Sequence, residues 1–308
     1  MSEYYIKKLT KLLKKTGWTQ TKLAHELGVT HVALNRWLNN HVVPHASHRI
    51  QIDQLYKNLI GLEKITDNGL RKYLKKAEAC RIKNISETIC NNLDLQQELK
   101  LELTYNSNTI EGMTFSKKET DAVIFGHQII TNQTLLDHLA LTNHVQALED
   151  IFKGSYAEDI TEATIRGLHK TVMQGIRSDA GEYASFSRAI RGVNLKLPAP
   201  VDIPEEMRHL IQLLNQRKPE EHVVCHVAST HASFEAIHPF GDGNGRVGRL
   251  MMAIQLISMD YPPVLIENAR KAEYYDVLEY AQVKSPLNLA KFICEEIEAS
   301  HNIFMKYS

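Results

Sequence analysis

The chain has 308 residues, 43% of them hydrophobic and 23% charged, and its 36 Lys and Arg balance 36 Asp and Glu. This length allows a small domain and a larger one. The four cysteines are widely spread, which argues against a disulfide framework or a zinc ribbon and favours a reducing compartment. We find no N-terminal apolar signal segment and no stretch near the ~20 apolar residues that span a bilayer, so we expect a cytoplasmic protein without a membrane partner.

The first sixty residues have the spacing of a helix-turn-helix. A periodic helix begins at the cap-like Thr19 and stops at Gly28, and residues 31–38 form a second short helix. Residues 1–60 contain nine Lys and Arg and three Asp and Glu, so their net charge is +6, whereas the rest of the chain carries a net charge of −6. This asymmetry favours an anionic partner. The expected core comprises Leu23, Ala24, Leu27, Val29, Leu34, Trp37 and Leu38.

This segment resembles the repressor-like helix-turn-helix family, which implies a bacterial cell and DNA as a partner. The second helix would face the major groove, with Arg36 a candidate for guanine and Lys22 for phosphate. The other candidates on this surface are Thr30, His31, Val32, Ala33 and Asn35. A small bundle whose basic residues are only a solvated face is the alternative. One such module usually needs a dimer for useful affinity, so a homo-oligomer stays open.

Residues 61–104 are rich in Lys, Glu, Asn and Leu and lack Pro, which indicates connecting helices. Ser107 and Glu111 then lie four apart and would share one helix face, while Gly112 suits the left-handed position that ends a helix.

Aliphatic residues at helical spacing continue downstream and predict a mainly α fold. The segments concerned are 134–152, 204–214, 221–237, 246–259 and 270–304. We expect a helix-turn-helix domain over 1–60, a helical connector over 61–104 and a larger domain over 105–304. Between residues 193 and 197, Val193, Leu195 and Leu197 alternate with polar residues, which predicts a short strand.

Residues 238–249 read His-Pro-Phe-Gly-Asp-Gly-Asn-Gly-Arg-Val-Gly-Arg. Glycines let backbone N–H groups turn toward an anion, and a helix beginning near Gly245 would direct its N-terminal amides there. Arg246 and Arg249 would share one face of that helix. The segment therefore predicts a triphosphate site, since a plain glycine-rich turn would not need His, Asp, Asn and two Arg as well.

Three other sites do not fit the sequence. The loop lacks the Gly-Lys-Ser/Thr end of a P-loop. An EF-hand would need Gly and Glu where Val247 and Ala253 stand. His222 and His226, four apart with a third histidine nearby, satisfy part of a zinc site, but Val223 takes the place of the Glu in His-Glu-x-x-His. We interpret these as packing or surface histidines.

Residues 238–249 resemble the signature of Fic-domain proteins and match it at every defined position. The resemblance implies a Fic-type helical core and transfer of AMP from ATP to a Ser, Thr or Tyr hydroxyl of a target protein, which includes the chain itself. His238 would be the base and Asp242 would hold Mg²⁺ on the phosphates. Arg249 would face the γ phosphate, and Phe240 would be buried. The other implied nucleotide ligands are Gly241, Gly243, Asn244, Gly245 and Arg246.

The same resemblance implies self-inhibition. Residues 107–112 resemble the family's inhibitory helix, with Ser107, Glu111 and Gly112 as its motif residues; there the glutamate pairs with the last signature arginine, here Arg249, and blocks the γ phosphate. Val193, Asn194 and Leu195 occupy the place of a β-hairpin flap whose strand edge would register the target. A hairpin with no partner is the alternative. Ala184 departs from the arginine that many relatives carry before this flap.

Residues 270–278 resemble the family's helix that closes the adenine end. Tyr274 or Tyr275, which lie in this segment, would stack near the base. Aromatic core packing at helical spacing is the alternative. Two other functions also stay open. One is removal of AMP, or transfer of another phosphate group, by the same fold; removal would make Glu111 useful for aligning a water. The other is a DNA-binding transcription regulator whose Fic portion senses nucleotide without turnover.

Overall fold

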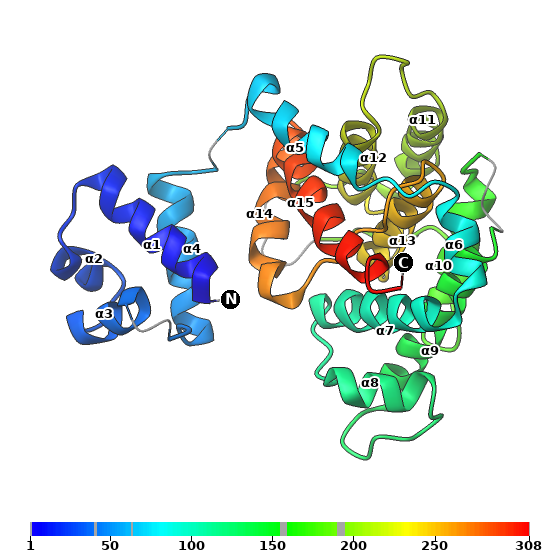
Figure 1. The fold of residues 1–308 in the computed structure, drawn as a ribbon, viewed down its shortest axis with the longest axis horizontal. Helices are drawn as coiled ribbons and strands as arrows, with labels where there is room; N and C mark the ends of the chain where they lie inside the picture. The colour runs from blue at the N-terminus through cyan, green and yellow to red at the C-terminus, as the bar shows by residue number, and fades with distance from the viewer. Residues whose placement is uncertain (1, 40–41, 63, 155–158, 190–194, 308) are drawn as a thin grey trace. The chain divides into compact units, whose positions relative to one another are not determined.

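The protein is described by a computed structural model that covers residues 2–39, 42–62, 64–154, 159–189 and 195–307. The chain divides into two compact units, Met1–Lys64 and Ile65–Ser308, and each has its own hydrophobic core (Figure 1). The mainly α fold class is confirmed. Over the described ranges there is also no helix long and apolar enough to cross a membrane.

The first unit is a helical bundle around the predicted helix-turn-helix. Its helices are α1 (Ser2–Thr16), α2 (Gln20–Glu26), α3 (His31–Asn39) and α4 (Ala46–Leu59). Thr19 caps α2, because its hydroxyl accepts the N–H of Lys22 at 3.2 Å. Five of the expected core residues are buried, whereas Val29 and Leu38 are partly buried at the edge of the core. The buried residues that complete this core come from α1 and α4: Tyr5, Leu9, Leu12 and Ile52.

The second unit surrounds two successive helices, α12 (Val223–Ile237) and α13 (Asn244–Ile257). The helices α11 (Ile203–Asn215), α14 (Lys271–Val283) and α15 (Leu287–Phe304) pack on α12, which has buried residues on every side. On α13 pack α7 (Leu93–Ile110), α9 (Leu135–Phe152) and α10 (Glu162–Val172). The remaining elements are α5 (Asp67–Ala79), α6 (Ile85–Asn91), α8 (Lys117–Ile124), η1 (Pro200–Asp202) and η2 (Asn268–Arg270). Both helices that flank the loop between α12 and α13 are therefore held by several neighbours.

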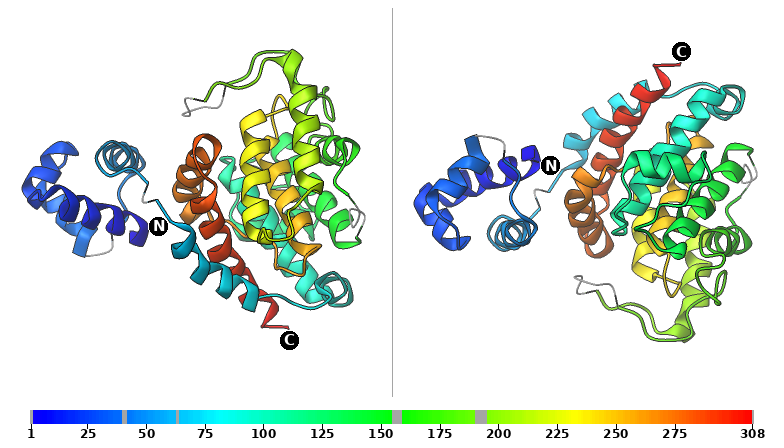
Figure 2. Two further views of the ribbon diagram at one scale, coloured as in Figure 1. Left: turned by 90° about the horizontal axis from the view of Figure 1, so that it is seen from above. Right: turned by 90° about the horizontal axis from the view of Figure 1, so that it is seen from below.

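The segment expected to connect the domains is helical, and from Ile65 onward it belongs to the second unit. α5 lies along α15, as Figures 1 and 2 both show. The turn before α6 is tied to the end of α13, because Ile82 donates its N–H to the carbonyl of Asp260 at 2.8 Å.

Among the residues that the structure describes, the expected β-hairpin flap is not seen. Leu195 lies in a segment without strand pairing, and Val193 and Asn194 fall outside the described residues. Alternation alone does not make a strand, because a strand needs a partner for its backbone hydrogen bonds. After residue 194, the chain is held by a side chain: Arg188 donates from Nη2 to the carbonyl of Pro198 at 2.6 Å.

Candidate functional site

The loop between α12 and α13 begins at His238, where α12 ends. His238 donates its N–H to the carbonyl of Phe234 at 2.9 Å and has left-handed backbone angles, φ 50° and ψ 58°. A non-glycine residue in this region is uncommon and is often found at functional sites. The chain thus leaves the helix axis at His238, whose side chain is 22% exposed.

Asn244 holds the loop in shape. Its side-chain oxygen accepts the N–H of Phe240 and its side-chain nitrogen donates to the Phe240 carbonyl, both at 2.9 Å. Phe240 is fully buried and stacks on the ring of His169, with centroids 3.7 Å apart. Because the Asn244 carboxamide is committed to the loop, Asn244 can offer an anion only its backbone N–H.

The start of α13 presents unpaired amide groups. The first backbone bond of the helix joins the Val247 N–H to the Gly243 carbonyl at 3.0 Å. The N–H groups of Asn244, Gly245 and Arg246 precede it and have no carbonyl partner in the helix. Gly243 caps the helix with φ 78°, where a side chain would be strained and would also lie 2.7 Å from the sulfur of Met173. This geometry suits an anion, which the helix dipole favours at the same end.

Arg246 and Arg249 are both buried on the α13 face that continues from this anion site. Nη2 of Arg246 lies 3.7 Å from the carboxylate of Asp242, whose side chain is 60% exposed. Burial lowers the pKa of Arg246, and its Nε is buried without a hydrogen-bond partner among the described residues. Arg246 therefore retains capacity to bind an anion.

Arg249, in contrast, is bound by the end of α7 through its Nε and Nη2 atoms. Its Nε donates to the Ser107 hydroxyl at 2.9 Å and its Nη2 to the Ser107 carbonyl at 3.0 Å. Nη2 also lies 2.6 Å from Oε1 of Glu111. Burial lowers the pKa of Arg249, but the Glu111 carboxylate outweighs burial and the pKa is raised overall. The pair is therefore an ionic contact between helices far apart in sequence.

The end of α7 places Glu111. Gly112 has φ +104°, the Met113 N–H reaches the Asn108 carbonyl at 3.2 Å and the Gly112 N–H reaches the Thr109 carbonyl at 3.1 Å, which is a Schellman C-cap. Glu111 is the C-cap residue itself. A Cβ at Gly245 would collide with Oε1 of Glu111, so the carboxylate lies directly against the start of α13.

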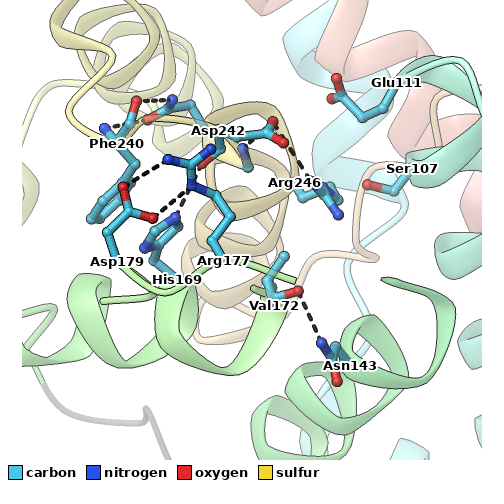
Figure 3. A network of polar contacts seen from close by, with 12 residues as sticks. Ser107, Glu111, Asn143, His169, Val172, Arg177, Asp179, Phe240, Asp242 and Arg246 are labelled. Atoms are coloured by element: carbon cyan, nitrogen blue, oxygen red, sulfur yellow. Dashed lines mark hydrogen bonds and ion pairs between the residues drawn. The ribbon is translucent and has the colours of Figure 1, made fainter. Parts of the chain in front are cut away.

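Sequence reasoning missed the residues that support the loop from α10 and the segment after it. The Gly181 N–H donates to His169 Nδ1 at 2.8 Å, so His169 Nε2 carries the proton that it donates to the Asp242 carbonyl at 3.1 Å. Burial lowers the pKa of His169 to about 4 and keeps it neutral. Arg177 and Asp179 form a two-bond pair beside the loop, at 2.6 and 2.8 Å (Figure 3). His169 acts through two distant backbone groups, and Arg177 and Asp179 form a simple side-chain pair, so no local motif marks these residues.

Comparisons with known proteins agree with this geometry. The profile of the Fic/DOC family matches residues 159–256, and a helix-turn-helix profile matches residues 9–52. The chain therefore carries a Fic domain behind a helix-turn-helix domain.

Its curated relatives are named protein adenylyltransferase Fic. The relative from Aedes aegypti is 26% identical over 231 residues, which are 73% of this chain and 45% of the relative. The relative from Nematostella vectensis is 30% identical over 193 residues, 60% of this chain and 44% of the relative. The chain thus spans less than half the length of these relatives.

Two solved structures share the fold. A Fic domain containing signaling protein from Bacteroides thetaiotaomicron aligns with a TM-score of 0.64 at 24% identity, over 77% of this chain and 96% of that one. Fic-1 from C. elegans aligns with a TM-score of 0.67 at 19% identity, over 93% of this chain and 84% of that one.

On α14, Tyr274 takes the alternative role of core packing. It is fully buried, its hydroxyl lies 2.7 Å from His231 Nε2, and its ring packs on Phe292 with centroids 5.9 Å apart. The expectation that Tyr274 stacks on a base is therefore corrected, because its ring has no open face. Tyr275 is 36% exposed and keeps that candidacy.

The upstream histidines of the Fic domain have protein partners. His226 lies 3.2 Å from both the Leu214 carbonyl and a Glu221 oxygen, and His222 accepts the Val224 N–H at 3.2 Å. Across the described residues no group of three His, Cys, Asp or Glu could hold a metal ion. His222 and His226 therefore pack against protein groups.

In the helix-turn-helix domain, the DNA-binding candidates share the exposed surface at and before α3. Thr30 caps α3 by accepting the Ala33 N–H at 3.1 Å. Lys22 lies 4.9 Å from the centroid of the Trp18 ring. The exposed members of the candidate set are Lys22, Thr30, His31, Val32, Asn35 and Arg36, and Ala33 is half-buried.

Proposed function

We propose that the Fic domain transfers AMP from ATP to a hydroxyl side chain of a protein, and that Glu111 restrains this activity. The observation that carries the proposal is the loop from His238 to Arg246. It brings together a histidine, the first N–H groups of a helix and a buried arginine whose Nε has no hydrogen-bond partner among the described residues. Phosphate transfer requires mainly positioning and charge stabilisation, and these groups supply both. The similarity to protein adenylyltransferase Fic supports AMP as the transferred group.

His238 is the proton acceptor in this proposal. The hydroxyl oxygen of the target bonds to the α phosphorus, its proton passes to His238, and pyrophosphate leaves. A histidine accepts a proton near neutral pH, and a positioned base typically contributes about 10²–10⁴-fold in rate.

The start of α13 would bind the phosphates through the N–H groups of Asn244 and Gly245, with Arg246 beside them. Asp242 would hold Mg²⁺, since this ion binds through one or two carboxylates together with substrate phosphates and waters, and the Asp242 side chain is exposed beside the anion site. The ion would neutralise phosphate charge.

Restraint follows from the position of Glu111. Its carboxylate occupies the approach to Gly245 and neutralises Arg249, which would otherwise face the terminal phosphate. A phosphate arriving there would meet a like charge at close range. Removing the carboxylate should free both the arginine and the space.

Intact-protein mass spectrometry tests the proposal. Wild type, Glu111→Gly and Glu111→Gly/His238→Ala would be incubated with ATP and Mg²⁺, with Glu87→Gly as a control that removes an exposed glutamate of α6. We expect one added AMP in the Glu111→Gly single variant alone. An equal adduct in wild type would overturn the restraint. No adduct in any variant, with ATP binding shown by calorimetry, would contradict self-modification and direct the search to a separate target or to AMP removal.

We further propose that the helix-turn-helix domain binds duplex DNA through α3. The exposed Arg36 and Asn35 and the local charge of +6 support this. Fluorescence anisotropy with mixed-sequence duplex DNA tests it on the full chain. Arg36→Ala should weaken binding and reduce its salt dependence, whereas Arg71→Ala in α5 should not. Equal binding by both variants would contradict the proposal.

A further inference from the structure

A second carboxylate lies behind His238. Glu235 belongs to α12, three residues before His238, and its side chain is only 7% exposed. Its Oε2 atom lies 3.7 Å from Nδ1 of His238. Within the described residues, neither His238 Nδ1 nor Glu235 Oε1 has a hydrogen-bond partner, although both atoms are buried. A buried carboxylate and a buried ring nitrogen that face each other without other partners have few structural reasons to be there.

We propose that Glu235 is a positioning residue for His238. Its carboxylate accepts the Nδ1–H of neutral His238, which leaves Nε2 without a proton and free to accept one from the target hydroxyl. When His238 becomes charged, the carboxylate stabilises the imidazolium. The separation of 3.7 Å is long for a hydrogen bond, and such contacts often tighten only when substrate binds. This inference rests on the proposed role of His238 as the base.

The surroundings keep Glu235 ionised. Burial raises its pKa, but the neighbouring His238 and the positive charge of Arg249 lower it below its usual value. His231 stays neutral, because burial lowers its own pKa to about 4. Besides these groups, Tyr274 and Tyr275 of α14 face the carboxylate.

The neighbouring helix leaves room for this carboxylate. A Cβ at Gly248 of α13 would lie 2.6 Å from Glu235 Oε1, so a larger residue there would displace this carboxylate. Arg249, the permanently charged group near Glu235, is itself bound by Ser107 and Glu111 at the end of α7. Glu235 could in principle serve only to balance Arg249, and a test must separate that role from positioning.

The ring nitrogens of His238 provide that test without any activity. On uniformly ¹⁵N-labelled full chain at a pH where His238 is neutral, two-bond ¹H–¹⁵N spectra distinguish the tautomers, and the His238→Ala variant identifies the signals. We expect the Nδ1–H tautomer in wild type. We expect Glu235→Leu to give a mixture and Glu235→Gln, which keeps an acceptor, to retain the preference. An Nε2–H tautomer in wild type would overturn the inference even if every variant failed to fold.

Kinetics in the Glu111→Gly background add a second readout. Glu235→Gln should reduce kcat at least about tenfold with little change in the KM for ATP. It should also move the acid limb of the rate profile to lower pH by about one unit, because the neutral amide no longer stabilises the imidazolium. Glu206→Gln, an exposed site on α11, is the matched control.

A merely structural glutamate would leave the tautomer and the acid limb unchanged, and that result would overturn the inference. If no variant transfers AMP while wild type shows the Nδ1–H tautomer, the proposed function fails and the positioning of His238 by Glu235 stands.

Discussion

The carboxylate of Glu111 lies 2.6 Å from the guanidinium of Arg249, although 138 residues separate them in the chain. The same oxygen fills the space beside Gly245, at the start of the helix that would receive a phosphate. One contact thus neutralises a cation and covers the amides next to it. It also predicts a coupling between nucleotide binding and stability.

Glu111→Gln should destabilise the nucleotide-free second unit, because Arg249 is buried and would lose its counter-charge. Breaking a fully buried pair costs about 3–5 kcal/mol, and with Glu111 partly exposed we expect about 1–2 kcal/mol. Urea denaturation followed by circular dichroism measures this. The two tryptophans, Trp18 and Trp37, lie in the first unit, so their fluorescence is an internal control. ATP should stabilise the variant more than wild type; equal stabilisation would contradict the coupling.

Asn244→Ala should weaken both the fold and the anion site. It removes two hydrogen bonds of 2.9 Å and leaves the backbone N–H and carbonyl of Phe240 unpaired in the interior. We expect a loss of about 2–4 kcal/mol from the free energy of unfolding. Calorimetric titration with ATP should show at least tenfold weaker binding. Asn143→Ala, which loses hydrogen bonds to two other carbonyls, serves as a comparison. Unchanged ATP affinity in the Asn244 variant would show that the loop keeps its shape without the clamp.

Arg188→Ala should impair transfer more than nucleotide binding. Arg188 donates to the His238 carbonyl and to the Pro198 carbonyl, each at 2.6 Å, and so joins the catalytic loop to the segment that precedes α11. Burial lowers the pKa of this guanidinium, which indicates that the contact is shielded from water. We expect kcat in the Glu111→Gly background to fall about tenfold with the ATP dissociation constant unchanged. Arg188→Lys, with a single ammonium, should restore only part of the rate. Full activity of Arg188→Ala would show that His238 needs no support from this side.

Acid should destabilise the second unit through buried neutral histidines. His144 of α9 lies 3.0 Å from the Thr104 hydroxyl, and burial, with the positive charges of Arg249 and Arg246, lowers its pKa to about 3. The unfolded chain therefore binds a proton below pH 6.5 that the folded chain does not bind until about pH 3. Stability then falls as pH falls through this window.

Replacing His144 with Gln removes one such proton. The slope of unfolding free energy against pH between about 4.5 and 6 should become shallower by about 1.4 kcal/mol per pH unit. Urea titrations at several pH values measure the slope. His301→Gln in α15, where the histidine is half-buried, is the control. An unchanged slope for His144→Gln would mean that the folded chain also protonates this ring.

Features that depend on neighbouring residues could be predicted from the amino-acid order alone. The spacing of apolar side chains predicted a mainly α chain with a helix-turn-helix at its start, and Gly112 marked the end of α7, because a left-handed C-cap is a local requirement. The loop at residues 238–249 could also be recognised from the sequence, because its motif residues are contiguous in the chain. Alternation was not sufficient for a strand over the described residues 195–197, since strand formation depends on a partner elsewhere.

Packing between helices determines which groups from distant parts of the chain come into contact. The packing of α7 on α13 brings Glu111 to Arg249, and the packing of α10 on α13 places His169 against Phe240. Tyr274 has the same helical spacing as a ligand-facing aromatic residue, yet α12 and α15 bury it. In the sequence, Glu235 is an ordinary polar residue of a helix. Its special position becomes evident only in the structure, where its carboxylate lies in the space beside Gly248. Such contacts arise from burial and charge pairing between helices, which local sequence does not specify.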